Sequence, residues 1–168
     1  MASELKNLSN YEDCGILHNS PEKKYKIGIA ISEWNKEITE SMADAAIETL
    51  KKYSFTTNDI LVRHVPGSFE LPLAAKYFID YAKVDAVICL GCVIQGDTRH
   101  FDFVCSGVTQ GIMELNISTG IPVAFGLLTT NNQQQALDRS GGRLGNKGNE
   151  AAIAVLKMLY LKHNLQCK

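Results

Sequence analysis

A histidine among small polar residues, His100 in the segment 96–100 (GDTRH), is well suited to proton transfer in this 168-residue chain. Imidazole titrates near neutral pH and can therefore take up or release protons under ordinary conditions. The segment follows an apolar run over 86–94 and precedes a pattern of helical spacing that begins at Phe101. The alternative role is structural, because many histidines at the start of a helix are satisfied by local backbone.

Two further groups of residues have the chemistry to bind an anion. Gly96, Asp97 and Thr98 precede a predicted helix, whose unpaired amides and positive dipole end favour phosphate. They match neither GxxxxGK[ST] nor GxGxxG, so an ordinary loop in which Asp97 or Thr98 caps the helix is the competing interpretation. Arg139 and Lys147 flank a glycine-rich segment, and a guanidinium suits bidentate binding of phosphate. The competing interpretation is that Arg139 and Lys147 lie at a solvated helix end.

Carboxylate and aromatic residues lie near the ends of predicted strands. Glu70 could accept hydrogen bonds from polyol hydroxyls or simply complement a helix dipole. Trp34 and Phe125 could stack on a planar heterocycle, although large aromatic residues more often belong to a core. Trp34 is the better candidate of the two, because it lies beside Asn35 at the end of a strand.

The cysteine pattern argues against a disulfide framework or a metal site. An odd number of cysteines, three of them in segments that are typical of a core, favours a reduced cytosolic protein. Cys89 and Cys92 form a CxxC pattern, but alternation within a buried strand places their sulfurs on opposite faces. The five cysteines are Cys14, Cys89, Cys92, Cys105 and Cys167.

The elements that must position these residues follow from hydrophobic periodicity. Short apolar runs predict strands over Tyr25–Ser32, Asp59–Val65, Asp85–Ile94 and Pro122–Thr129. Helical spacing predicts helices over 39–53, from Ser68 as N-cap to Phe78, from 101 to a stop at Gly120, through Ala136 to Arg139, and over 149–163. The second long helix, 101–120, is expected to bury Val104, Cys105, Val108, Ile112 and Leu115.

Alternation of strands and helices predicts right-handed crossovers and a parallel sheet of about four strands covered by helices. In such sheets ligands bind beyond the carboxyl ends of the strands. Trp34, Glu70, His100 and Phe125 belong to the ends of successive predicted strands, so we expect most of them to lie at one edge of the sheet.

Composition narrows the class of protein. The formal net charge of −1 gives no support to nucleic-acid binding or to a basic membrane surface, and no apolar run is long enough for a membrane span. The N-terminus has no apolar signal segment, which also favours a cytoplasmic protein. Residues 1–24 are polar and show no sustained hydrophobic period, so we expect an extension that is disordered alone or ordered against a neighbouring subunit. One α/β domain is expected to follow over residues 25–168.

Several longer segments resemble the 6,7-dimethyl-8-ribityllumazine synthase family of riboflavin biosynthesis. They occur in the family's order and cover the chain from about residue 26 to the last helix. The segments are SEWNKEIT (32–39), VPGSFELPLAAK (65–76), LGCVIQGDTRHFDFV (90–104), PVAFGLLTT (122–130) and QALDRSGGRLGNKGNEAA (135–152).

The resemblance implies a flavodoxin-like three-layer α/β/α sandwich and a reaction that needs no metal or redox cofactor. The implied transferase condenses 5-amino-6-(D-ribitylamino)uracil with 3,4-dihydroxy-2-butanone 4-phosphate. It also implies that His100 transfers protons, that Glu70 accepts the ribityl hydroxyls and that Trp34 stacks on the pyrimidine. The other residues implied on the uracil side are Asn35, Ser68 and Phe69, with Cys92, Val93 and Ile94 offering backbone groups.

On the phosphate side, the resemblance implies that Asp97 and Thr98 bind the butanone phosphate together with Arg139, and that Lys147 lies near the ribityl or phosphate end. Phe125 is implied to come from an adjacent subunit. Members of the family form pentamers, some of which assemble into icosahedral capsids, and the uninterrupted spacing from Arg139 to Lys147 favours the shell.

Three other readings stay open at this stage. The first is an archaeal-type riboflavin synthase, or a paralogue with another substrate preference. The second is a flavodoxin-like binding module that holds a flavin without turnover, which leaves His100 and Arg139 without a role. The third is a structural shell protein whose catalysis has lapsed.

Overall fold

The structure is a computed structural model that describes residues 15–166. The first 14 residues of the predicted extension, with Cys14, lie outside the described residues, as do Cys167 and Lys168.

Four parallel strands form the central sheet, in the order β2-β1-β3-β4. All four predicted strands are confirmed, with ends shifted by one or two residues. The strands are β1 (Ile27–Ser32), β2 (Ile60–Val65), β3 (Ala86–Ile94) and β4 (Val123–Thr130). Because β1 pairs with both β2 and β3, the carboxyl ends of these three strands meet at one edge of the sheet.

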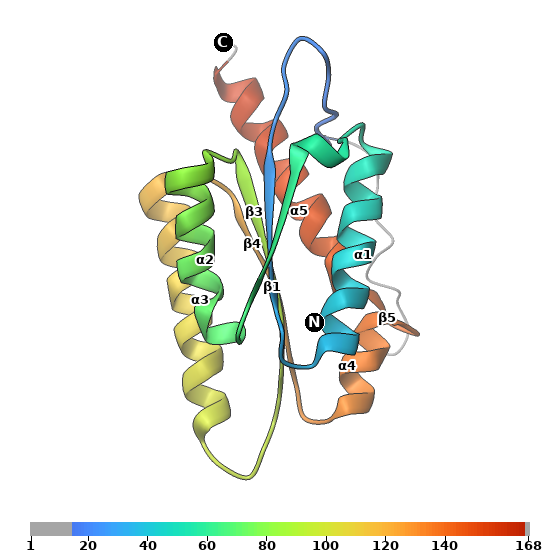
Figure 1. The fold of residues 1–168 in the computed structure, drawn as a ribbon, viewed down its shortest axis with the longest axis vertical. Helices are drawn as coiled ribbons and strands as arrows, with labels where there is room; N and C mark the ends of the chain where they lie inside the picture. Colours follow the sequence, from blue (N-terminus) through green and yellow to red (C-terminus); the bar gives the residue numbers. More distant parts are fainter. Residues whose placement is uncertain (1–14, 167–168) are drawn as a thin grey trace.

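Helices cover both faces of the sheet, so the fold is a three-layer, flavodoxin-like α/β/α sandwich as predicted (Figure 1). One face carries α2 (Leu71–Tyr77) and α3 (His100–Thr119), and the other carries α1 (Lys36–Lys52), α4 (Gln133–Arg139) and α5 (Lys147–Gln166). Short 3-10 turns over Thr57–Asp59 and Ser68–Glu70 precede β2 and α2, and a π turn over Phe78–Ala82 extends α2.

The two central strands, β1 and β3, are largely apolar along their length because helices cover both of their faces. All six residues of β1 are buried, and so are the first seven of β3. Cys92 lies in the core against α1 and α5, whereas Cys89 lies in the core against α2 and α3, which confirms the predicted opposite faces. Ile16 and Leu17, which sequence analysis placed in the extension, are buried in the first of these cores.

Several helix ends follow ordinary capping chemistry. Gly120 ends α3 in the left-handed conformation (φ 63°), as predicted. The side chain of Asn132 accepts a hydrogen bond from the amide of Gln135 at the start of α4. Ser68, by contrast, is not the predicted N-cap: it begins a 3-10 turn, and its hydroxyl makes no capping hydrogen bond.

One expected set of buried residues is corrected. Val108 and Ile112 of α3 are buried, but Val104, Cys105 and Leu115 are only partly buried, because α3 is an outer helix that packs on the sheet with one side. The glycine-rich segment after α4 forms two short strands that were not predicted: β5 (Ser140–Gly142) and β6 (Gly145–Asn146) pair as an antiparallel hairpin.

No helix within residues 15–166 combines the length and the apolar character that crossing a membrane requires.

Candidate active site

The turn after β1 and the turn after β2 bring Trp34 and Glu70 together. A Cβ atom added at Gly67 would lie 3.5 Å from Cδ1 of Trp34 and 3.1 Å from Oε2 of Glu70. The indole edge and the carboxylate therefore both lie against Gly67. The Trp34 side chain is otherwise open, with 73% of the residue exposed. An exposed ring beside a carboxylate can stack on a heterocycle while the carboxylate accepts hydroxyl groups.

Ser68 and Phe69 lie between this cluster and α3. The Phe69 ring packs against Gly107, where an added Cβ would approach it to 3.1 Å, yet the residue is 60% exposed. Ser68 is buried against Gly91 of β3, and its hydroxyl has no hydrogen-bond partner among the described residues. A buried hydroxyl without a partner is uncommon, because leaving it unsatisfied costs free energy.

The end of β3 presents backbone groups next to this turn. The Cys92 carbonyl accepts a hydrogen bond of 2.9 Å from Nδ2 of Asn35, and Val93 and Ile94 are partly buried. The chain then continues away from β4 after a hydrogen bond from the Gln95 amide to the Thr130 carbonyl.

The loop after β3 delivers His100 to the first position of α3. His100, Asp97 and Thr98 are all exposed. The hydroxyl of Thr98 accepts a long hydrogen bond of 3.4 Å from the His100 amide, but Thr98 is not the predicted helix cap, because Arg99 occupies the N-cap position of α3. The Asp97 side chain makes no cap hydrogen bond at this helix start.

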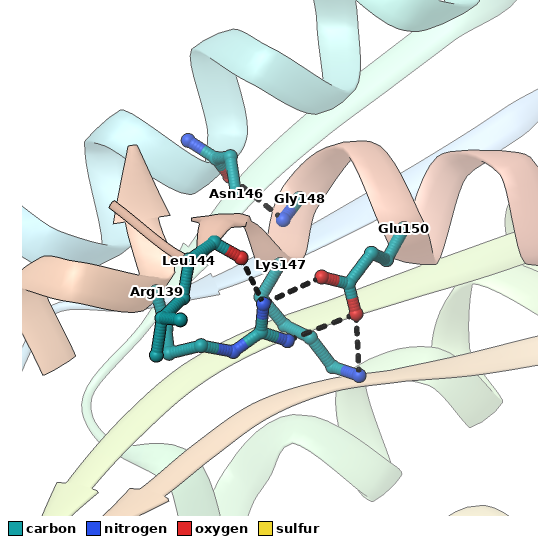
Figure 2. Close-up of polar contacts among 6 residues, drawn as sticks. All are labelled: Arg139, Leu144, Asn146, Lys147, Gly148 and Glu150. Carbon is teal, nitrogen blue, oxygen red and sulfur yellow. Dashed lines mark hydrogen bonds and ion pairs between the residues drawn. The ribbon is translucent and has the colours of Figure 1, made fainter. Parts of the chain in front are cut away.

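Arg139 lies in a network of ion pairs at the start of α5 (Figure 2). Its Nη1 and Nη2 donate to the two carboxylate oxygens of Glu150 at 2.7 and 2.9 Å, and Nη1 also donates to the Leu144 carbonyl at 2.9 Å. Lys147 donates to the same carboxylate at 3.3 Å. The Arg139 side chain is only 11% exposed, so the alternative of a solvated helix end is wrong.

A hollow of about 490 Å³ lies over this network, and positive charge prevails in it. Three cations (Arg139, Arg143 and Lys147) and two carboxylates (Asp138 and Glu150) line it, a formal balance of +1. Hydrogen bonds from Arg143 and Gln134 hold the pKa of Asp138 below its usual value, which keeps this carboxylate charged. The hollow is suited to an anion that meets the guanidinium and ammonium groups.

Phe125 is not at a strand end, contrary to the expectation from sequence. It is the third residue of β4, level with Cys89, and it lines a separate hollow of about 940 Å³ beside α3. Within residues 15–166, neither this hollow nor the basic one is lined by Trp34, Glu70 or His100. One chain therefore presents the candidate residues in separate groups.

The buried thiols are chemically quiet. Burial raises the pKa of Cys89 to about 12 and that of Cys92 to about 11, so both remain protonated near neutral pH. Within the part of the chain that the structure describes, no group of three or more His, Cys, Asp or Glu side chains is arranged to hold a metal ion.

Glu150 was not among the site residues predicted from the sequence. Its spacing of three from Lys147 on a helix was a visible signal for an ion pair. The contact with Arg139 spans 11 residues across the hairpin and depends on how that hairpin folds back.

Comparisons with known proteins assign a family to this architecture. Residues 24–163 match the family described as 6,7-dimethyl-8-ribityllumazine synthase. A 6,7-dimethyl-8-ribityllumazine synthase of Phocaeicola vulgatus is 52% identical over 99% of this chain and 97% of the relative. Its counterpart in Flavobacterium johnsoniae is 54% identical over 96% and 84%, and that in Porphyromonas gingivalis is 48% identical over 96% and 99%.

Proposed function

The chain belongs to the 6,7-dimethyl-8-ribityllumazine synthase family and is a transferase of riboflavin biosynthesis, and we propose how its residues divide the work of this reaction. The reaction condenses 5-amino-6-(D-ribitylamino)uracil with 3,4-dihydroxy-2-butanone 4-phosphate and releases phosphate and water. Its steps are imine formation, loss of phosphate, ring closure and dehydration. The convergence of Trp34 and Glu70 over Gly67, at the edge where β3 leads to His100, is the observation that carries the proposal.

The uracil substrate binds in the group around Gly67. Trp34 stacks on the pyrimidine, and Glu70 accepts hydrogen bonds from the ribityl hydroxyls. The Ser68 hydroxyl, which is buried without a partner among the described residues, gains one from the substrate. Phe69 extends the apolar wall. The backbone of Cys92, Val93 and Ile94 meets the edge of the heterocycle.

His100 transfers protons during imine formation and dehydration. Its exposure at the start of α3 leaves the imidazole accessible to a ligand held at the sheet edge. Asp97 and Thr98 contribute to the phosphate site through backbone amides, because a carboxylate facing phosphate is unfavourable.

Arg139 and Lys147 bind and stabilise the phosphate group. The guanidinium has five N–H donors, and within residues 15–166 Leu144 and Glu150 accept from three of them, which leaves two for a further acceptor. Glu150 holds both cations in place at the basic hollow. Fixed cations favour phosphate departure because they stabilise the charge that develops on the leaving group.

The uracil-binding group and the phosphate-binding group come from two neighbouring subunits that meet at the site. Separation of Phe125 and Arg139 from Trp34 and His100 within one chain supports a site that the neighbouring subunit completes with Phe125, Arg139 and Lys147. The α2–α3 side of the fold carries apolar residues that are each more than half exposed. These residues support self-association into pentamers, with an icosahedral shell as the larger assembly. The residues are Phe69, Leu73, Tyr77, Tyr81, Phe103, Met113 and Ile117. We place the enzyme in the cytoplasm, where buried thiols stay reduced.

Incubation of the purified protein with both substrates tests the function. Lumazine absorbance and phosphate release should rise together; tight flavin binding without product would instead indicate a binding module, and neither signal would indicate a lapsed enzyme.

One variant in each of these two groups tests the roles of the residues. His100→Ala should lower kcat without abolishing turnover, because positioning of two substrates supplies much of the acceleration. Arg139→Ala should chiefly raise KM for the butanone phosphate. An unchanged kcat in His100→Ala would remove His100 from the mechanism.

A further inference from the structure

The Asn35 side chain links two parts of the uracil site that lie far apart in the sequence. Its Nδ2 donates to the Cys92 carbonyl at 2.9 Å, across 57 positions of the chain. Asn35 follows Trp34 directly, and Cys92 is the first of the residues that offer backbone to the pyrimidine. One hydrogen bond thus connects the stacking residue to the strand that reads the ring edge.

Trp34 lies on a turn that is held on both sides. Before it, the Glu33 amide donates to the Val65 carbonyl of β2 at 2.9 Å. After it, Asn35 is held by β3, and the Asn35 carbonyl accepts from the amides of Ile38 and Thr39 at the start of α1. The backbone on either side of Trp34 is therefore tied to the sheet, while the ring itself is 73% exposed.

The residue type at position 35 fits this task. Asn35 adopts the left-handed conformation, with φ 57° and ψ 47°. Asparagine tolerates this conformation better than most residues other than glycine, and it also carries an amide donor. Glycine would adopt the same backbone conformation but has no side-chain N–H donor. Aspartate would keep the shape of the side chain and also lacks that donor.

On this geometry, and resting on the proposed function, we propose that Asn35 is a positioning residue for uracil recognition: its amide holds Trp34 and the Cys92–Ile94 edge at the spacing that one pyrimidine ring needs. The side-chain nitrogen of Asn35 donates to the Cys92 carbonyl, so this group acts on the substrate through the backbone that it holds. Stacking and edge recognition then act on the same ring without a rearrangement of the turn, which lowers the entropic cost of binding.

Trp34 supplies the readout, because it is the one tryptophan of the sequence. Time-resolved fluorescence anisotropy of the full-length, ligand-free protein reports the motion of the turn without any turnover. In Asn35→Gly the fast, local component of Trp34 depolarisation should grow. The same variant should raise KM for the uracil substrate about tenfold, the range that loss of one net hydrogen bond covers, with kcat within about threefold and KM for the butanone phosphate unchanged.

Two variants serve as companions. Asn35→Asp removes the donor while it keeps the side-chain shape, and it should reproduce the effects of Asn35→Gly; it also replaces that variant if the latter does not fold. Glu33→Ala lies on the other side of Trp34 and leaves the backbone bond to Val65, so both readouts should match the unmodified protein.

Unaltered Trp34 depolarisation in Asn35→Gly, or an equal rise in KM for both substrates, would overturn the assignment. Failure of the proposed function is distinguishable, because the unmodified protein would then form no lumazine while the anisotropy comparison would still report on the turn.

Discussion

Glu150 is the carboxylate that joins Arg139 and Lys147, and its removal should destabilise the protein strongly. In Glu150→Gln the amide nitrogen faces two cations, and three charge-assisted hydrogen bonds are lost or weakened. The side chains of Arg139, Glu150 and Lys147 are 11%, 18% and 26% exposed, respectively. Removing one partner of a fully buried pair costs about 3–5 kcal/mol, and the remaining exposure reduces our expectation to about 2–4 kcal/mol.

Urea unfolding at neutral pH measures the loss in the free energy of unfolding caused by Glu150→Gln, and Asp80→Asn is the matched control. Lys76 and Asp80 form an exposed ion pair on adjacent turns, with side chains 45% and 39% exposed. Its loss should cost about 0.5 kcal/mol or less, and that small effect should fall further at high salt. The penalty for Glu150→Gln should persist in 0.5 M NaCl (on the order of a 4 Å screening length), because most of the network is shielded from the solvent.

A double-mutant cycle separates pairing from other effects of the substitution. Glu150→Gln and Arg139→Gln should show a coupling free energy of about 2 kcal/mol. A loss below about 1 kcal/mol in Glu150→Gln, or additive effects in the cycle, would refute the view that this carboxylate holds the two cations.

Two further outcomes are expected. Gly148→Ala should cost about 3 kcal/mol or more, because its Cβ would lie 1.8 Å from the Met42 carbonyl oxygen and force α1 and α5 apart. Gly96→Ala should change the free energy of unfolding in urea by less than about 0.5 kcal/mol, because, apart from its chain neighbours, no atom of residues 15–166 lies within 4 Å of an added Cβ. Asp59→Asn should cost about 1–2 kcal/mol at pH 7, because both the Thr56 hydroxyl and amide donate to the carboxylate. Those bonds lower the pKa of Asp59 from 3.8, so its contribution is complete above that value and lost as pH falls through the lowered pKa. Equal stability of the two glycine variants, or a pH-independent Asp59→Asn penalty, would contradict these expectations.

Sequence patterns sufficed for most of the fold. The apolar run over 86–94 predicted a strand buried on both faces, and β3 is such a strand. Gly120 predicted the end of α3, and the alternation of strands with helices predicted a parallel sheet. These features are local, because hydrophobic period, capping and turn chemistry depend on residues within a few positions of one another.

Local patterns failed where a residue's environment depends on a distant segment. Ser68 has the residue type of an N-cap, but packing against Gly91 turns its hydroxyl inward. Phe125 was expected at a strand end, yet the register of β4 on β3 places it level with Cys89. Half-burial of Cys105 likewise reflects the outer position of α3 rather than its own periodicity.

By itself, the sequence determined the four strands of the central sheet and the helices between them, the family motifs that they carry and the side chains that have the chemistry for condensation. Only the tertiary structure decided the pairings: Asn35 with Cys92, and Arg139 with Glu150 rather than with solvent. The physical reason is that such contacts depend on strand order and on how the hairpin after α4 folds back. Local residue spacing encodes neither of these arrangements.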